Sequence, residues 1–406
     1  MKLWDKIIHY PKISLVILAY IAFIALGMPD GLLGVAWPSM RADFSVPLDS
    51  LGLLLIASTI GYMSSTFLSG ALIPRIGIGK LLALSCALTG AALLGDTLVP
   101  SWWMMVALGL FGGLGAGAID AGLNTYVAAH FGEGLMQWLH ASYGIGVTIG
   151  PIIMTLALTN LNSWRVGYRV VSGVQLVLAV CFLLTLSWWK DQDDAPGMEQ
   201  QEKLLTDYQT SLGETFRQLN VWVSFLLFFL YVGGEASLGV WTYSLLTESR
   251  GVPPQTAGFL AGSFWATFTV GRILAGVYAK RLGTHKLIQG GVALALFSAV
   301  LLWWNPFPWT DVLAVALAGI AVAPVFPALM SATRERVGAK FAANTIGMQI
   351  AAAGLGTMVI PGLLGVLARR FSLEIIPVCQ IAIFLGLFGL YRLSMIKKKV
   401  DKEAIS

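Results

Sequence analysis

The stretch Gly112–Pro151, GGLGAGAIDAGLNTYVAAHFGEGLMQWLHASYGIGVTIGP, decides the fold, because it reads as two apolar helices joined by the short turn AHFGEG. The first helix carries Asp120 and Asn124, which are four residues apart and therefore share one helix face. The second helix carries His140 at a similar distance from the turn. Polar and ionisable groups inside apolar spans are costly, and they face a polar cavity or a partner. The stretch therefore predicts a polar site inside a bundle of membrane helices.

The composition extends this interpretation to the whole chain. Of its 406 residues, 57% are hydrophobic and only 12% are charged, whereas a soluble domain carries about 25% charged residues. The net charge of +5 does not indicate a nucleic-acid partner, because the basic residues lie in short segments between apolar runs. The three cysteines lie inside apolar runs and show neither metal-ligand spacing nor a disulfide pattern. We expect the first apolar run to remain as a membrane anchor, because it is long enough to span.

Twelve apolar runs are long enough to cross a bilayer, which takes about 20 residues. They are 13–37, 49–73, 79–98, 102–128, 135–159, 166–189, 219–246, 255–279, 285–304, 310–332, 341–367 and 373–395. The long polar segment between the sixth and seventh runs predicts three parts. These are a six-helix bundle over 1–190, a cytoplasmic central loop over 191–218 that includes a surface helix, and a second six-helix bundle over 219–406.

The basic residues predict the orientation of the chain. With alternating helices, 19 of the 26 Lys and Arg residues fall on the side of the N-terminus, six fall on the other side, and Arg272 lies within a span. Because cytoplasmic loops carry an excess of Lys and Arg, we expect both termini to be cytoplasmic in a multi-pass protein of the cell (inner) membrane. Paired tryptophans at the span ends are typical of interfacial belts.

The two halves of the chain resemble one another. A shift of 206 residues places Gly52, Gly70, Arg75, Gly77 and Lys80 on Gly258, Gly276, Arg281, Gly283 and Lys286. A shift of 205 places Asp30 on Glu235, and a shift of 210 places Gly146 on Gly356. Such a repeat predicts an all-α polytopic membrane protein. Its twelve transmembrane helices form two pseudo-symmetric six-helix bundles, with the substrate site between them.

Twelve spans, a 6+6 repeat and a long central loop resemble the major facilitator superfamily. The segment 70–80, GALIPRIGIGK, is similar to that superfamily's G-x-L-a-D-R-x-G-R-K signature, and 276–286, GVYAKRLGTHK, is its counterpart in the other half. Both segments lack the signature's aspartate, so the charge relay that latches the inner gate is in doubt here. Arg75 and Arg281 keep the arginine, and the resemblance makes them candidate gating residues.

Within the superfamily, the chain is most similar to the fucose/galactose/glucose–proton symporter branch. The similarity lies in GLGAGAIDAGLN, LHASYGIGVTIGP and GIAVAPVFPALMS, from the fourth, fifth and tenth spans. The resemblance implies an acidic residue in the first span for coupling and another in the fourth for sugar contact. Asp30 and Asp120 occupy those spans, although the fourth-span residue of the sugar symporters is typically a glutamate.

Proton coupling is assigned to Asp30 and Glu235, because a carboxylate within the bilayer either pairs with a cation or binds a proton. The alternative for Asp30 is a loop carboxylate just outside the membrane. Arg272, in the eighth span, is interpreted as a gating residue that closes the cytoplasmic side by a salt bridge. The alternative for Arg272 is a partner for an acidic substrate or for Glu235.

Substrate binding is assigned to polar and aromatic residues of the spans, which offer hydrogen bonds and ring faces to hydroxyl groups. They are Asp120, Asn124, His140, Tyr143, Trp37, Trp265 and Gln349, with Tyr231 as a further candidate for the cavity wall. Each has a structural alternative. The first three could tie two helices together, Trp37 could be an interfacial residue, and the others could pack between helices.

The chain shows no P-loop, zinc spacing, hydrolytic triad or dinucleotide-binding strand–loop–helix, so neither an enzyme, an ATP-driven pump nor a cofactor is expected. We expect a monomeric secondary active transporter that couples a sugar or similar polyol to protons, rather than to sodium, by alternating access. One alternative is proton-coupled efflux of amphipathic compounds, because Gly146–Pro151 is a GxxxGP run that resembles a motif of drug–proton antiporters. A non-transporting receptor of the same fold is another.

Overall fold

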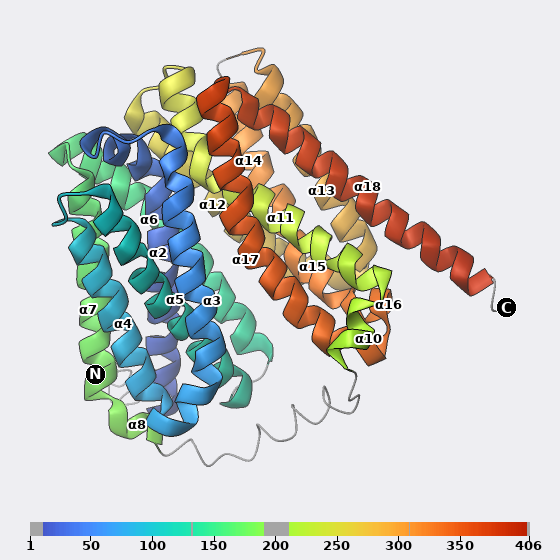
Figure 1. The fold of residues 1–406 in the computed structure, drawn as a ribbon, viewed down its shortest axis with the longest axis horizontal. Coiled ribbons are helices and arrows are strands. Elements are labelled where there is room, and N and C mark those ends of the chain that lie inside the picture. Colours follow the sequence, from blue (N-terminus) through green and yellow to red (C-terminus); the bar gives the residue numbers. More distant parts are fainter. Residues whose placement is uncertain (1–10, 131–132, 191–210, 308, 404–406) are drawn as a thin grey trace. The chain divides into compact units, whose positions relative to one another are not determined.

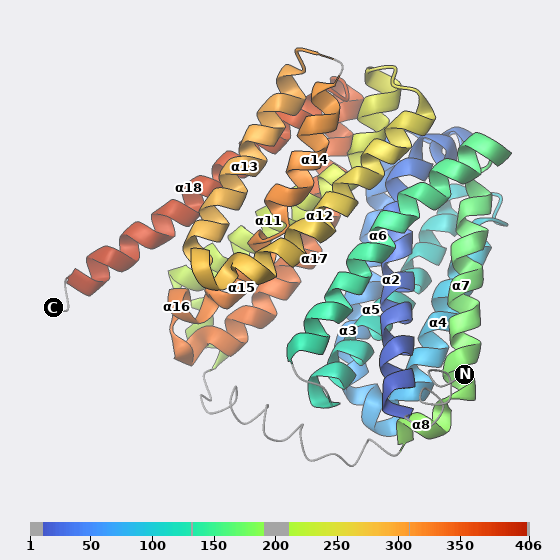
Figure 2. The ribbon, with the colours of Figure 1, turned by 180° about the vertical axis from the view of Figure 1, so that it is seen from behind.

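A computed structural model describes residues 11–130, 133–190, 211–307 and 309–403, and these ranges are helical without any strand. The chain divides into two compact units. The first unit contains α2 to α8, and the second contains residues 47–52 and the helices from α10 onward (Figures 1 and 2). The two units are described separately.

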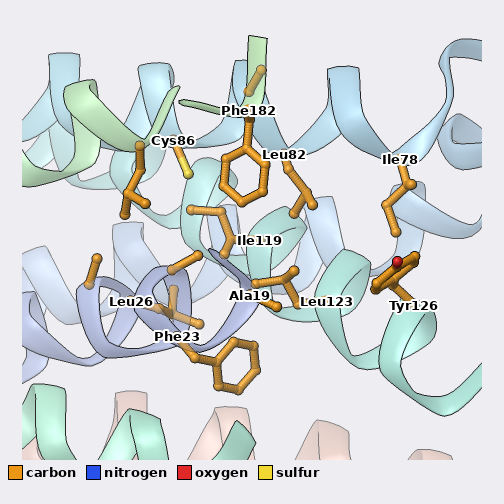
Figure 3. Packing of buried hydrophobic residues seen from close by; sticks show 14 of the residues in the cluster. Ala19, Phe23, Leu26, Ile78, Leu82, Cys86, Ile119, Leu123, Tyr126 and Phe182 are labelled. Atoms are coloured by element: carbon orange, nitrogen blue, oxygen red, sulfur yellow. The ribbon is translucent and has the colours of Figure 1, made fainter. Parts of the chain in front are cut away.

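The helices of the first unit follow the predicted spans closely. They are α2 (Pro11–Asp43), α3 (Leu51–Ile76), α4 (Ile78–Asp96), α5 (Trp102–His130), α6 (Glu133–Leu161), α7 (Trp164–Leu184) and the short α8 (Leu186–Lys190). The core between α2, α4, α5 and α7 is apolar, with Phe23, Leu82, Ile119 and Phe182 almost wholly buried (Figure 3). The outward faces of these helices are apolar as well, with Ile21, Leu84 and Val177 exposed, so the spans are hydrophobic all round, as membrane helices are.

The second unit begins with a segment that lies between α2 and α3 in the sequence. Its elements are η1 (Leu48–Ser50), α10 (Leu212–Phe216), α11 (Leu219–Ser244), η2 (Leu245–Ser249, a π turn), α12 (Pro254–Leu282), α13 (Thr284–Trp304), α14 (Thr310–Val322), α15 (Val325–Ser331), α16 (Thr333–Val337), α17 (Ala339–Arg370) and α18 (Ile375–Glu403). Of the predicted central loop, residues 191–210 lie outside the described residues, and α10 follows them.

The predicted twelve-helix architecture is confirmed. In the described residues, eleven helical spans are long and apolar enough to cross a membrane. The eighth predicted span is α12, whose 29 residues are also long enough, although Arg272 and several hydroxyl side chains make it more polar. The tenth predicted span is interrupted, because α14 ends at Val322 and α15 begins at Val325.

Glycines allow the helices of each unit to approach closely, and they do so at repeat-related positions. A Cβ on Gly146 of α6 would collide with the carbonyl oxygen of Ile24 on α2, and one on Gly356 of α17 would collide with that of Phe229 on α11. The offset of 210 residues relates Gly146 to Gly356, and the offset of 205 residues relates Ile24 to Phe229, so the two contacts are equivalent in the repeat. The internal repeat is therefore a repeat of helix packing, in which small residues let backbones meet.

We expect Gly146→Ala to destabilise the first unit, because its methyl group has no room against the α2 backbone. Overpacking of this kind costs about 1–3 kcal/mol, so the purified variant should unfold at a lower temperature than the wild type. Gly173→Ala on α7 is the matched control, since nothing lies within 4 Å of a Cβ there. Equal unfolding temperatures for the two variants would contradict the close-packing account.

In each of the two signature-like segments, 70–80 and 276–286, a glycine adopts the backbone conformation that joins two helices. Gly77 and Gly283 have φ angles of +78° and +77° and immediately precede α4 and α13. Residues with a side chain rarely adopt this conformation, whereas glycine does so freely. The adjacent Arg75 and Arg281 are exposed, and in the described residues no ion pair involves either of them, so their gating role stays a prediction.

Candidate functional site

Asp30 is the first of three carboxylates that, among the described residues, lie well inside membrane-spanning helices rather than at their ends. It lies 13 residues before the end of α2 and therefore inside the helix rather than in a loop. The side chain is exposed, and Tyr143 of α6 donates a hydrogen bond to its Oδ2 at 2.5 Å. The close packing of α2 against α6 at Gly146 holds these two residues opposite one another. An exposed carboxylate at this depth indicates a water-accessible polar face, because contact with lipid would be costly.

Asp120 of α5 is the second carboxylate, and it is held by neighbours on both of its oxygens. Tyr62 of α3 donates to Oδ2, and Asn124 donates to Oδ1 at 2.8 Å. Asn124 also donates to the backbone oxygen of Asp120 at 3.0 Å, which is possible because the two residues are one helical turn apart. The carboxyl groups of Asp120 and Asp30 are close enough for their charges to interact. The first unit thus has one polar group of Asp30, Tyr143, Tyr62, Asp120 and Asn124.

Two other predicted ligand contacts of the first unit lie differently. His140 of α6 is exposed, and its ring meets the edge of Phe23 at a centroid distance of 5.8 Å. Trp37 is fully buried, and its ring packs against Trp102 at 5.4 Å. The His140 ring is thus partly covered by Phe23 but exposed, whereas the buried Trp37 ring has no exposed face for stacking on a ligand.

Glu235 of α11 is the third carboxylate. The tyrosine hydroxyl that contacts it also contacts a backbone carbonyl. The hydroxyl of Tyr231, one turn earlier on the same helix, contacts both Glu235 Oε2 and the carbonyl oxygen of Val322, the latter at 2.8 Å. A phenol has one proton to donate, and a backbone carbonyl can only accept. The two acceptors therefore share the single phenolic proton of Tyr231, unless Glu235 carries a proton of its own and donates it to the tyrosine oxygen.

The carbonyl of Val322 is available because the tenth span breaks there. Pro324 cannot donate a backbone hydrogen bond and disfavours a continuous helix, so α14 ends at Val322 and α15 starts at Val325. Discontinuous spans provide backbone groups for substrate and ion sites in transporters. The break lies beside Glu235 and Tyr231, within the second unit.

Arg272 of α12 is the cation of this second group. Its charge acts on both Glu235 and Tyr231, but no ion pair within 4.0 Å joins it to a carboxylate in the described residues. The guanidinium lies over the ring of Phe268, 4.3 Å from its centroid. The predicted salt bridge that closes the cytoplasmic side is not seen among the described residues, and the role of Arg272, as a gating residue or as a partner for Glu235 or for an acidic substrate, stays a prediction.

Trp265 and Gln349 are buried within the second unit. Trp265 packs against Phe264 and Phe268, with ring centroids 4.8 and 5.6 Å away. Gln349 of α17 donates to Thr333 Oγ1 at 2.9 Å and is fully buried. Gln349 joins α16 and α17, and Trp265 packs against rings of its own helix and against Gly239 of α11. Their binding role stays a prediction.

The partners of the carboxylates were the features that sequence reasoning missed. Tyr62 lies 58 residues from Asp120, and no spacing or motif links the two. Tyr143 was grouped with His140, but its hydroxyl bonds Asp30, 113 residues away. The repeat offers no signal either, since Glu235 takes its tyrosine from its own helix. In the described residues, no cluster of His, Cys, Asp and Glu could hold a metal ion.

Comparison with known proteins identifies one family of membrane transporters. The family model of the Major Facilitator Superfamily matches residues 19–361 and, in a second match, residues 223–404. The mouse sodium-dependent glucose transporter 1A is 25% identical over 87% of this chain and 89% of its own. The glucose/mannose transporter GlcP of Bacillus subtilis is 22% identical over 85% and 86%.

Solved structures are similar over nearly the whole chain. A D-xylose–proton symporter has a TM-score of 0.71 at 16% identity, covering 94% of this chain and 98% of its own. A nucleoside transporter, NupG, has a TM-score of 0.77 at 14% identity, covering 95% and 100%. These two proteins carry different solutes, so the likeness shows the fold and leaves the substrate to be argued from the site.

Proposed function

This chain belongs to the Major Facilitator Superfamily, and on that premise we propose that it couples the uptake of a sugar to protons by alternating access. The chain is a multi-pass membrane transporter and not an enzyme. The observation that carries the proposal is that Asp30, Asp120 and Glu235, the carboxylates well inside the described spans, each contact a tyrosine hydroxyl.

A sugar as substrate is supported by the relatives and by the chemistry of the first unit. The two relatives described above are named as transporters of glucose or of glucose and mannose. Tyr62, Asp120, Asn124 and His140 offer both donors and acceptors, as a ligand rich in hydroxyl groups requires. We therefore keep Asp120, Asn124, His140 and Tyr143 as the proposed substrate-binding residues and add Tyr62.

Proton coupling is supported by the hydrogen-bond stoichiometry at Glu235. When Glu235 is protonated, Tyr231 can donate to Val322 while accepting from Glu235. When Glu235 is ionised, the single phenolic proton goes to the carboxylate and the Val322 carbonyl loses its donor. One proton on Glu235 thus changes the contacts at the break between α14 and α15. Asp30, bonded to Tyr143, is proposed as the coupling carboxylate of the first unit.

Alternating access is supported by the helix packing inside each unit, which is repeated from one unit to the other. A transporter built from two similar bundles can rock one bundle against the other. The excess of basic residues on one side supports cytoplasmic termini. The GxxxGP run that suggested efflux packs α6 against α2 through Gly146 and Gly150. This packing accounts for the run without a role in antiport, so efflux is kept only as an outcome of the test.

The test is uptake of labelled glucose, mannose and xylose by purified protein in liposomes, with either a proton or a sodium gradient imposed. Accumulation driven by an inward proton gradient, and abolished by a protonophore, is the expected result. Accumulation that follows the sodium gradient alone would show that sodium, and not the proton, is the coupling ion. Export of lipophilic cations without any sugar uptake would contradict symport and indicate that the protein is an efflux transporter.

A further inference from the structure

We propose that the transported solute is an acidic sugar, a uronate or aldonate, whose carboxylate binds Arg272. This inference rests on the transport function proposed above and deepens it by naming the substrate class.

The backbone fixes Arg272 beside the helix break. Arg272 lies 18 residues after the start of α12 and ten before its end, or about 27 and 15 Å along the axis. The preceding residue, Gly271, lies close to the end of α14. A Cβ atom added to Gly271 would be 2.7 Å from the Cβ atom of Ala323. The arginine is therefore placed deep in the span and next to the interruption that follows Val322, where transporters of this architecture provide polar groups.

The guanidinium of Arg272 is oriented by an aromatic ring, and among the described residues it has no polar partner. The Phe268 ring supports one face of it at 4.3 Å, and Nε is enclosed without a hydrogen bond. In the described residues, its terminal nitrogens make no hydrogen bond either, and the side chain is only half-buried. A planar guanidinium held in this way matches a carboxylate, which can accept two parallel hydrogen bonds from it. A single guanidinium balances a monoanion, so a carboxylate fits better than a dianionic phosphate.

Glu235 does not fulfil this role, because its carboxyl group is engaged by Tyr231. The charges of Glu235 and Arg272 nevertheless interact. When Glu235 is ionised, a substrate carboxylate arriving at Arg272 brings a second negative charge to this group. Uptake of one proton from solution by Glu235 restores the charge balance, so the anion and the proton are expected to bind together.

The experiment measures binding of matched sugar pairs to the detergent-purified protein by ligand-induced thermal stabilisation. The probes are glucose with glucuronate and galactose with galacturonate, at several pH values. Arg272→Gln removes the charge, Arg272→Lys keeps it, and Arg370→Gln removes an exposed charge of the same unit as the matched control.

We expect the wild type to bind an acidic sugar at least tenfold more tightly than its neutral counterpart, since a hydrogen-bonded charge typically contributes a tenfold factor or more. Arg272→Gln should lose this preference, Arg272→Lys should keep part of the preference, and Arg370→Gln should keep all of it. Binding of the acidic sugar should tighten as pH falls, while the sugar carboxylate stays ionised.

Two results would overturn the inference and separate it from the broader function. Binding and transport of neutral sugars without any preference for the acidic ones would refute the role of Arg272 and leave proton–sugar symport standing. Failure of every neutral and acidic sugar to bind the folded wild type would refute both. An equal loss of acidic and neutral binding in Arg272→Lys would indicate a structural role for the arginine.

Discussion

Asp30→Asn is expected to abolish sugar accumulation against a gradient while leaving exchange of sugar across the membrane. Asparagine keeps the size of the side chain and can still accept the hydrogen bond from Tyr143, so the α2–α6 contact should persist. It cannot take up or release a proton near neutral pH. Transport should therefore be uncoupled, with the internal sugar concentration rising only to the external one.

The measurement compares two assays on the same proteoliposomes, namely proton-driven accumulation and counterflow of labelled sugar. Glu248→Gln, an exposed acidic residue at the end of η2, is the matched control and should behave as the wild type in both. Normal accumulation by Asp30→Asn would remove Asp30 from the coupling mechanism. Loss of counterflow as well would assign Asp30 to substrate binding or folding instead.

Arg250→Met is expected to cause the largest loss of stability of any single substitution in the second unit. Arg250 follows η2 and forms salt bridges with Asp311 at the start of α14 and with Glu374 just before α18. It also donates to the carbonyl oxygen of Leu302 at 2.7 Å. Only 9% of the arginine side chain and 5% of the Asp311 side chain are exposed. Removing one partner of a buried ion pair costs about 3–5 kcal/mol, because the other charge is left without compensation.

Two variants identify the cause of this loss in thermal unfolding of the purified protein. Arg250→Met combined with Asp311→Asn should recover part of the stability, since the uncompensated buried charge is then gone. Arg370→Gln, at an exposed site, should unfold like the wild type. If Arg250→Met is as stable as Arg370→Gln, the cluster does not hold the ends of these helices together.

The same cluster predicts a sensitivity to acid. Burial acts to raise the pKa of Glu374, but the hydrogen bonds from Arg250 and Ser249 outweigh it and hold the pKa below its usual range. A carboxylate whose pKa is lower in the folded state stabilises that state above its unfolded pKa, about 4.3 for glutamate. This contribution is lost as pH falls through the folded-state pKa. The difference in stability between the wild type and Arg250→Met should therefore shrink in acid.

Much of the fold follows from the sequence, because a bilayer demands long apolar helices whose ends are marked by charge and tryptophan. Most spans are found within a few residues of their predicted ends, although α2 runs six residues and α18 eight residues past them. The paired glycines of the repeat reappear as matched helix contacts. The interruption after Val322 was missed. Its proline was visible, but proline is common in membrane helices, and only the tertiary contact with Tyr231 shows that the break has a partner.

The candidate sites were predictable in their charged members and not in their partners. Asp30, Asp120 and Glu235 stand out because ionisable residues are rare in apolar spans. Tyr62 does not stand out, since aromatic residues are frequent there and its pairing depends on how α3 meets α5. Arg250 was counted only as a loop residue of the outer side, because its ion-pair partners are 61 and 124 residues away. Trp37 is buried by Trp102, a contact that no local pattern encodes.

The central claim is that sugar and protons move together, and proton movement itself tests it most directly. Wild-type protein would be reconstituted into liposomes that contain a pH-sensitive dye, and a panel of neutral and acidic sugars would be added one at a time without any imposed gradient. The account predicts acidification of the lumen on addition of a transported sugar, absent in Asp30→Asn. Uptake of a labelled sugar with no change in luminal pH would contradict proton coupling.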